Sequence, residues 1–222
     1  TGILVFTVIP ILFMILVAFT NYDGAHDGYS NLFTWVGLSN FNELISSSSA
    51  DANLSYTFGE ILSWTLMWAF FATFTNYFLG MLVAILINKK GIHFKKLWQD
   101  LYESSKIDGA SVWQQYMKIT LPYMLFVTGP YLLTQFIGNI NNFNVIYLLT
   151  SGRPASPDLV TSGGSATTTD LLITWLFNIT TGATSNYKLA AVIAIMIFVV
   201  VAVLSLIVYN VIPSTRNEED YS

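Results

Sequence analysis

The clearest apolar run in the sequence is Leu189–Tyr209, which extends for 21 residues without a charged side chain. A helix of about 20 apolar residues is the length needed to cross the hydrocarbon core of a bilayer. A second run, Ile61–Ile87, is long enough to span a bilayer with tilt. Over the whole chain 54% of the residues are hydrophobic and 10% are charged, whereas about a quarter are charged in an ordinary soluble domain. The sequence therefore predicts an integral membrane protein.

Two further runs complete the set of expected spans. The first run, Gly2–Phe19, is near the minimum length for a spanning helix and contains Pro10. A cleaved signal peptide is the competing interpretation, but no basic segment precedes this run and no small-residue cleavage site follows it. The other run begins at Ile119 and passes Pro122 and Pro130. We therefore expect an all-α, polytopic transmembrane bundle with four spans in this sequence.

The positions of the basic residues predict the orientation of these spans. Six of the nine Lys and Arg residues lie between Lys89 and Lys118, where no apolar run is long enough to span. Basic loops stay on the cytoplasmic side of a membrane. We therefore expect residues 88–118 and the C-terminus to be cytoplasmic. Residues 21–56, which carry four acidic and no basic side chains, and the loop that contains Arg153 are expected to be external.

Two short segments leave alternatives open. Asp170–Thr180 is apolar and holds two aromatic residues, so it is either an interfacial helix or the start of the last span. Trp35–Phe41 is a short amphipathic piece, and its aromatic residues suit the interfacial belt of a membrane. A plain surface loop is the alternative for this second segment.

Several function classes are excluded by residues that the chain lacks. There is no cysteine, and the two histidines, His26 and His93, have no metal-ligand spacing around them. We therefore expect no metal site and no catalytic residues. The chain contains no G-x-x-x-x-G-K-[ST] phosphate-binding loop, so any ATP hydrolysis must come from another chain. We expect the chain to be no enzyme and to bind no nucleic acid.

The segment Leu101–Pro122 is a charged, amphipathic insert between apolar runs. On a helix, Leu101, Ser104, Ser105 and Asp108 fall at i, i+3, i+4 and i+7, which makes a mostly polar stripe. Gly109 lets the backbone turn between two short helices because it has no Cβ. An apolar face follows the turn, and such a segment is expected to lie on a partner or on a membrane surface. The residues of this face are Trp113, Tyr116 and Met117.

This insert carries a resemblance to a known family. Glu103, Ser104 and Ser105 are followed by Gly109 six residues after the glutamate, and by Ile119-Thr120-Leu121-Pro122 ten residues further on. The pattern resembles the signature loop of binding-protein-dependent ABC importer permeases, in which Ala-Ala usually follows the glutamate. Residues 139–150, NINNFNVIYLLT, resemble the MalF-like maltose/maltodextrin branch. Residues 151–154, SGRP, depart from that branch, where a glycine-rich turn is usual.

The resemblance implies a type I ABC importer permease fold for residues 1–222 as a single transmembrane domain. Its cytoplasmic coupling region is 88–118, with the signature loop at 101–122. By the resemblance, this loop docks in a groove of a cytoplasmic ATPase dimer, which binds the ATP and Mg, with Glu103 as a polar contact and Gly109 as a hinge. The implied coupling residues are Glu103, Ser104, Ser105, Asp108, Gly109, Leu121 and Pro122.

The other implied partners are a second, MalG-like permease subunit, an extracellular or periplasmic solute-binding protein and an oligosaccharide. The implied location is the plasma membrane of a prokaryote, which the protein crosses several times. Permeases of this family keep a core of six spans. We therefore expect the sequence to lack two of them, between Gln99 and Asp100.

A substrate site is expected near the end of the third run. Gln135, Asn139 and Asn142 occur at i, i+4 and i+7, so on a continuous helix they share one face with Tyr131. Amides donate and accept hydrogen bonds together, which suits sugar hydroxyls, and Phe143 or Tyr147 could stack on a sugar ring. The resemblance implies sugar contact for Asn139 and Asn142. The alternative is that these amides bond to neighbouring helices or mark a helix end.

The function expected from these features is ATP-driven import of a carbohydrate, such as maltose or maltodextrin, by alternating access. A stand-alone secondary carrier or channel for a small polar solute is the alternative. Ion-coupled carriers normally hold ionisable residues inside their spans. Here Glu60 lies at the edge of one span and the interiors of the others are uncharged, which favours the importer.

Overall fold

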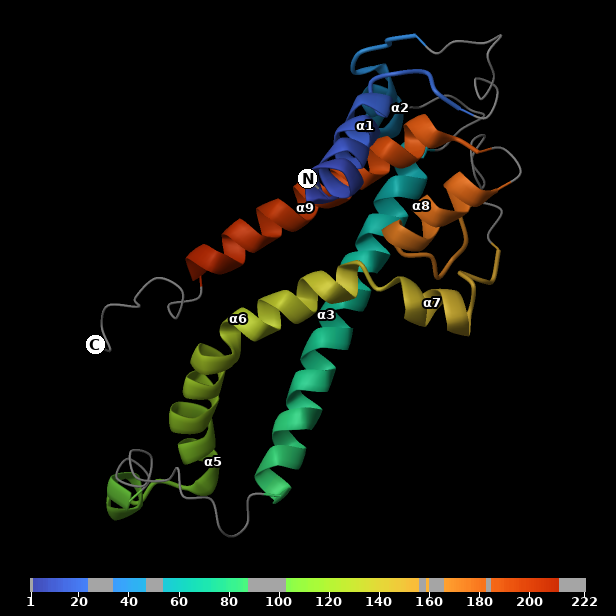
Figure 1. The fold of residues 1–222 in the computed structure, drawn as a ribbon. Coiled ribbons are helices and arrows are strands. Elements are labelled where there is room, and N and C mark those ends of the chain that lie inside the picture. Colours follow the sequence, from blue (N-terminus) through green and yellow to red (C-terminus); the bar gives the residue numbers. More distant parts are fainter. Residues whose placement is uncertain are drawn as a thin grey trace. The chain divides into compact units, whose positions relative to one another are not determined.

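The structure is a computed structural model, and it describes residues 2–23, 34–46, 54–87, 103–155, 159, 166–182 and 185–211. Within these ranges the chain is helical apart from turns and two isolated β-bridges, so the all-α class is confirmed. The chain forms two compact units, one from Thr1–Ala69 with Gly138–Ala202 and one from Phe70–Ile137 with Val203–Ser222. The helices (Figure 1) are η1 (Leu4–Val8), α1 (Ile9–Val17), α2 (Ser39–Ser46), α3 (Leu54–Ile87), α5 (Val112–Gln115), η3 (Tyr116–Thr120), α6 (Leu121–Ile140), α7 (Phe143–Leu149), α8 (Leu172–Thr181) and α9 (Tyr187–Val211).

Two of these helices are long and apolar enough to cross a membrane, judged on the described residues. They are Leu54–Ala84 in α3 and Tyr187–Ile207 in α9, and only 17% and 28% of their most apolar stretches are buried. A helix in the core of a soluble protein would bury most of its apolar side chains. Leu4–Val17 is apolar but shorter, and α6 is a 20-residue helix. All four expected runs are therefore helical, and membrane crossing by α1 and α6 stays a prediction.

The core of the first unit forms around α8. Leu172, Trp175 and Ile179 of this helix are buried together with residues of α3 and α9. The Leu172 backbone N–H donates to the hydroxyl of Thr65 on α3 at 3.1 Å. Since α8 ends at Thr181 and α9 begins separately at Tyr187, the expectation that Asp170–Thr180 starts the last span was wrong. Placement of this helix at a membrane interface stays a prediction. The sequence showed an apolar segment, and packing against α3 and α9 decided where its side chains lie.

The end of α1 is joined to α2 by polar and aromatic contacts. The Asn40 side-chain amide donates to the carbonyls of Ala18 and Thr20, at 2.8 and 2.7 Å. The rings of Phe19 and Trp35 stack with their centroids 5.4 Å apart. The two hydrogen bonds satisfy carbonyls in the turn after α1, where the backbone has left the helix.

In the second unit, the C-terminal half of α3 pairs with the helical run that starts at α5. The Tyr116 hydroxyl donates to the Met81 sulfur at 3.7 Å, and the Thr128 hydroxyl to the Tyr77 hydroxyl at 3.0 Å. The backbone is helical from α5 through η3 into α6, with a π-helical stretch just before Pro122. The bend of α6 in Figure 1 follows from Pro130, which has no N–H and interrupts the helical ladder.

Candidate functional site

The coupling segment, residues 103–122, begins with a helical turn at 103–107 that ends in a Schellman motif. The Gly109 N–H donates to the Lys106 carbonyl at 3.1 Å, and the Ala110 N–H to the Ser105 carbonyl at 2.9 Å. Gly109 has φ +75°, and this left-handed conformation at the position after the helix end is the one that glycine favours. The expected turn between two short helices at Gly109 is thus confirmed.

A capping box starts the next helix two residues later. The Gln114 N–H donates to the Ser111 hydroxyl at 3.3 Å, and the Ser111 N–H donates to the Gln114 side-chain oxygen at 2.9 Å. This reciprocal pair satisfies two N–H groups that have no partner inside the helix. Gln115 is buried, and its amide donates to the Ala110 carbonyl at 3.3 Å. Local hydrogen bonds therefore define the path of the backbone from Ser104 to Gln115.

The apolar side chains of the coupling segment are exposed. Ile107, Val112 and Trp113 are 87%, 84% and 69% exposed, which is uncommon for residues of this size unless they meet a partner or lipid. Of the expected apolar face, Trp113 and Met117 are exposed, whereas Tyr116 stacks on Trp113 and bonds to Met81. Ile107 and Val112 were not expected, although each flanks the Gly109 turn. Of the expected coupling residues, Glu103, Ser104 and Asp108 are exposed and Ser105 is half-buried. Leu121 and Pro122 are the first two residues of α6.

The amide residues occupy two elements, not one helix face. Helix α6 continues through Gly138 and ends at Ile140, so Gln135 and Asn139 lie one turn apart on it. Asn142 lies beyond that end and caps α7, because its side-chain oxygen accepts from the Val145 N–H at 3.3 Å. The expectation of a single helical face through Asn142 was therefore wrong. The Asn142 amide still donates to the Asn139 side-chain oxygen at 3.4 Å.

Three aromatic rings cluster on α7 and α8. The Phe143 and Tyr147 rings stack at 4.8 Å, and the Phe177 ring meets them edge-on at 5.0 and 5.4 Å. Tyr147 is 40% exposed, so part of its surface is open to a ligand. Asn139, Asn142, Phe143 and Tyr147 all belong to the first unit, and Gln135 belongs to the second. Phe177 was missed because nothing in the sequence places α8 beside α7.

The loop after α7 is tied to the start of α8 through Asp170. This buried carboxylate accepts from the Thr167 N–H at 2.9 Å and from the hydroxyls of Thr167 and Thr174 at 2.7 and 2.9 Å. Gly152, at φ +79°, packs so close that an added Cβ would lie 2.3 Å from a carboxylate oxygen of Asp170. Ser151 has φ +49° and is the one non-glycine with positive φ in the described ranges. Residues 151–154, which lack the glycine-rich sequence usual in the maltose/maltodextrin branch, therefore still form a turn after α7.

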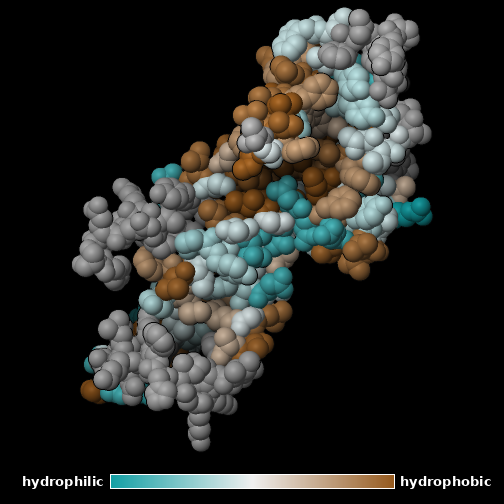
Figure 2. Space-filling view, in the orientation of Figure 1, coloured by the Kyte–Doolittle hydropathy of each residue, from teal (hydrophilic) through white to brown (hydrophobic). Residues whose placement is uncertain are grey.

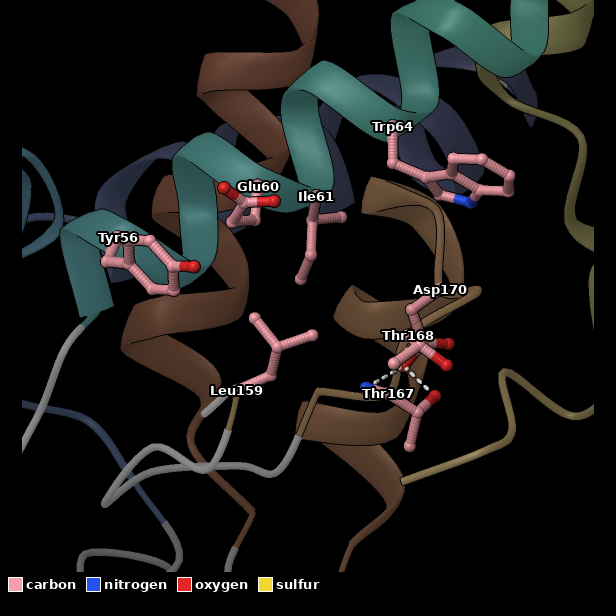
Figure 3. Close-up of a pocket in the computed structure, with 8 residues that line it drawn as sticks. All are labelled: Tyr56, Glu60, Ile61, Trp64, Leu159, Thr167, Thr168 and Asp170. Atoms are coloured by element: carbon pink, nitrogen blue, oxygen red, sulfur yellow. Dashed lines mark hydrogen bonds between the residues drawn. The ribbon is translucent and has the colours of Figure 1, made fainter. Parts of the chain in front are cut away.

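A cavity of about 240 Å³ lies between α3 and this loop (Figure 3). Ile61 and Leu159 point toward each other across it, and Glu60 and Asp170 also line it. Because the Asp170 carboxylate already accepts several hydrogen bonds, we interpret its role here as structural. The described part of the chain holds no cluster of three or more His, Cys, Asp or Glu residues that could bind a metal.

Comparison with known proteins identifies a family and several relatives. Residues 2–217 match the family described as binding-protein-dependent transport system inner membrane component. The maltodextrin transport system permease protein MalC of Streptococcus pneumoniae is 27% identical over 290 residues, covering 91% of this chain and 65% of the relative. In Bacillus subtilis, the maltodextrin permease protein MdxF is 27% identical over 97% of this chain and 68% of the relative. The galactooligosaccharide permease protein GanP of the same organism is 29% identical, over 97% and 69%.

The chain spans about two thirds of the length of these curated relatives. The match to MalC extends over 290 residues, yet 91% of this 222-residue chain is about 202 residues, so the matched region of the relative is longer by about 88. The expected absence of two spans between Gln99 and Asp100 stays a prediction, since both residues lie outside the described ranges. With a family match over nearly its whole length, the chain belongs to the binding-protein-dependent transport system inner membrane components.

Proposed function

We propose that the chain is a permease subunit of an ATP-driven importer that takes up a carbohydrate of the maltodextrin type. The observation that carries this proposal is the coupling segment. Its backbone is defined by a Schellman motif and a capping box, while Ile107, Val112 and Trp113 stay exposed. A segment that is ordered yet leaves large apolar side chains open is suited to a protein partner.

The proposed partner of the coupling segment is a cytoplasmic ATPase dimer that binds ATP and Mg. Trp113 and Ile107 supply apolar contact area, and Glu103 supplies charge at the edge of the same surface. Since the helical backbone continues from α5 to the end of α6, movement of the coupling segment would act on the helix that carries Gln135 and Asn139. This continuity supports coupling of nucleotide-driven motion to the amide cluster by alternating access.

The proposed substrate contacts are Gln135, Asn139, Asn142, Phe143 and Tyr147. Support comes from the side chains of Asn139 and Asn142, which lie within 3.4 Å of each other, and from the stacked, part-exposed ring of Tyr147. Amides with an adjacent aromatic surface suit a hydroxylated ring. Relatives named for maltodextrin and galactooligosaccharide transport support an oligosaccharide as the class of substrate.

The remaining proposed partners are a second permease subunit of the MalG type and an external solute-binding protein. The chain would lie in the plasma membrane of a prokaryote, with the coupling segment and the C-terminus in the cytoplasm. The concentration of basic residues between Lys89 and Lys118 supports this orientation.

The test is purification of the chain from its native membrane in nanodiscs, followed by identification of the subunits that accompany it. We expect an ATPase and a second permease, and ATP hydrolysis that rises at least several-fold with binding protein and maltodextrin. Recovery of the chain alone, with solute uptake driven by an ion gradient, would contradict the proposal and favour a secondary carrier.

A further inference from the structure

The short helix α2 has an apolar face that its own core covers only in part. Its buried side is formed by Asn40 and Leu44. Leu38, just before the helix, and Ile45 are 68% and 59% exposed, and they lie seven residues apart on the neighbouring arc. A shallow hollow runs along this arc, lined by Leu38, Ser39, Phe41, Asn42, Ile45 and Ser46.

The position of α2 is set by its attachment to the end of α1. Asn40 donates to two carbonyls in the turn after α1, the Val36 N–H donates to the Phe19 carbonyl at 2.8 Å, and Thr20 forms a bridge with Trp35. These contacts lie within the first compact unit. Wherever the end of α1 sits in the bilayer, α2 sits beside it.

The surface of α1 indicates what surrounds this end. Its large side chains are apolar and exposed, and Figure 2 shows a largely hydrophobic surface over this helix. In an inner membrane component, such a surface faces hydrocarbon or another membrane helix. The first polar side chains after α1, Thr20 and Asn21, accept or donate hydrogen bonds to the backbone of this junction, as expected where a helix leaves the hydrocarbon.

We propose that α2, together with Trp35 and Leu38, is an interfacial helix that lies in the headgroup and acyl boundary of the bilayer at the end of α1. Trp35 is 64% exposed although its ring stacks on Phe19, and an amphipathic indole at the end of a span is typical of the membrane interface. Leu38 and Ile45 enter the acyl region, and the opposite arc with Glu43 faces the headgroups.

The charge on α2 determines which kinds of bilayer the helix is expected to enter. The helix carries Glu43 and no Lys or Arg, so attraction to anionic headgroups contributes nothing to its binding. Its membrane affinity comes from the buried apolar area. We therefore expect α2 to enter zwitterionic bilayers as well as anionic ones, which differs from the behaviour of a basic amphipathic anchor.

The test uses single cysteines, because the natural chain has none. Leu38→Cys and Ile45→Cys place an environment-sensitive fluorophore on the apolar arc, and Glu43→Cys is the matched control on the polar arc. The complete transporter is reconstituted in phosphatidylcholine nanodiscs that contain lipids spin-labelled either near the headgroup or deep in the chain. We expect shallow spin labels to quench the fluorophores at positions 38 and 45 at least twofold more than the one at position 43.

Two outcomes would overturn this proposal. One is equal quenching of all three fluorophores by aqueous iodide with no quenching by lipid. The other is absence of lipid quenching together with a spectral change on adding the binding protein, which would make α2 a protein-docking surface. Since each label replaces an exposed side chain, the two positions test the proposal independently. Brominated lipid is expected to quench less tryptophan fluorescence in Trp35→Phe than in the unmodified chain, which has six tryptophans. This measurement needs no label.

Discussion

The coupling segment and the amide cluster differ in what their side chains do. In the coupling segment the hydrogen bonds are made by the backbone and by Ser111, Gln114 and Gln115, whereas Ile107, Val112 and Trp113 remain exposed. In the amide cluster the Asn142 side chain itself caps α7 and reaches Asn139. The first region is ordered independently of the residues proposed to bind, whereas in the second the same residues serve folding and the proposed binding.

This difference determines how a substitution should be interpreted in each region. A change at Ile107 or Val112, which are 87% and 84% exposed, removes a proposed contact and little buried surface. A change at Asn142 removes a helix cap together with any ligand contact, so loss of transport alone would not identify its role. The predictions below separate the two effects, from the largest expected change to the smallest.

We expect Glu103→Lys to reduce ATP-coupled uptake at least 100-fold while the protein stays inserted and folded. The substitution reverses a charge at the edge of the proposed docking surface, and desolvated like charges at an interface oppose association. Uptake of labelled maltodextrin into vesicles measures the effect. Glu43→Lys, the same charge change on exposed α2, is the control, and unchanged uptake by Glu103→Lys would refute the docking role.

Gly152→Ala should destabilise the protein more than Gly109→Ala, because only the first change creates a clash. Both glycines have positive φ, which costs an alanine about 1 kcal/mol or more. A Cβ at Gly109 meets open space, whereas one at Gly152 meets the Thr167 hydroxyl at 2.2 Å and the Asp170 carboxylate at 2.3 Å. We expect a loss of about 3 kcal/mol for Gly152→Ala, since overpacking adds 1–3 kcal/mol. Thermal unfolding in detergent would show it, and equal effects of the two changes would contradict the proposed packing.

Asn142→Ser should keep the cap and remove the amide donor. Serine caps helices about as well as asparagine, so the melting temperature should stay within a few degrees. If the amide binds sugar, the apparent affinity for substrate should fall about tenfold, which corresponds to about 1.4 kcal/mol. Asn142→Ala, which loses both functions, is the comparison variant. Normal affinity with Asn142→Ser would restrict this residue to capping α7.

Ser151→Gly should stabilise the loop after α7 by about 1 kcal/mol or less. Ser151 has φ +49°, a region that glycine occupies without steric cost. The gain is partly offset by the extra freedom of glycine in the unfolded chain. Denaturant unfolding of the detergent-solubilised protein measures the change. The Ser151 hydroxyl donates to the Tyr147 carbonyl at 3.1 Å. A loss of stability in Ser151→Gly would mean that this hydrogen bond contributes more than the backbone strain costs.

Those parts of the structure that depend on local signals were predicted from the sequence. The apolar runs that became α3 and α9 and the turn at Gly109 depend on composition and on one residue with special backbone freedom. A helix end at the amides was one of the alternatives left open, because the i, i+4, i+7 spacing of the amides does not reveal that Asn142 caps a new helix. An asparagine immediately before a run of apolar residues was the available signal.

Features set by tertiary contacts were not predictable in the same way. The burial of α8 depends on Thr65, more than 100 residues away, which accepts from the Leu172 N–H. The Asn40 contact with Ala18 and the edge-on contact of Phe177 with Phe143 and Tyr147 likewise join distant segments. A sequence pattern gives the type of such residues, and only the folded chain gives their partners.

The most direct measurement of the central claim is protection of the coupling segment by the ATPase. Val112→Cys, at a position that is 84% exposed in a chain without cysteine, can be labelled with a membrane-impermeant maleimide in nanodiscs that contain the second permease. We predict that adding the ATPase lowers the labelling rate at least tenfold, while a cysteine at Glu43 on α2 reacts at an unchanged rate. Labelling of Val112→Cys at the same rate with and without the ATPase would contradict the account.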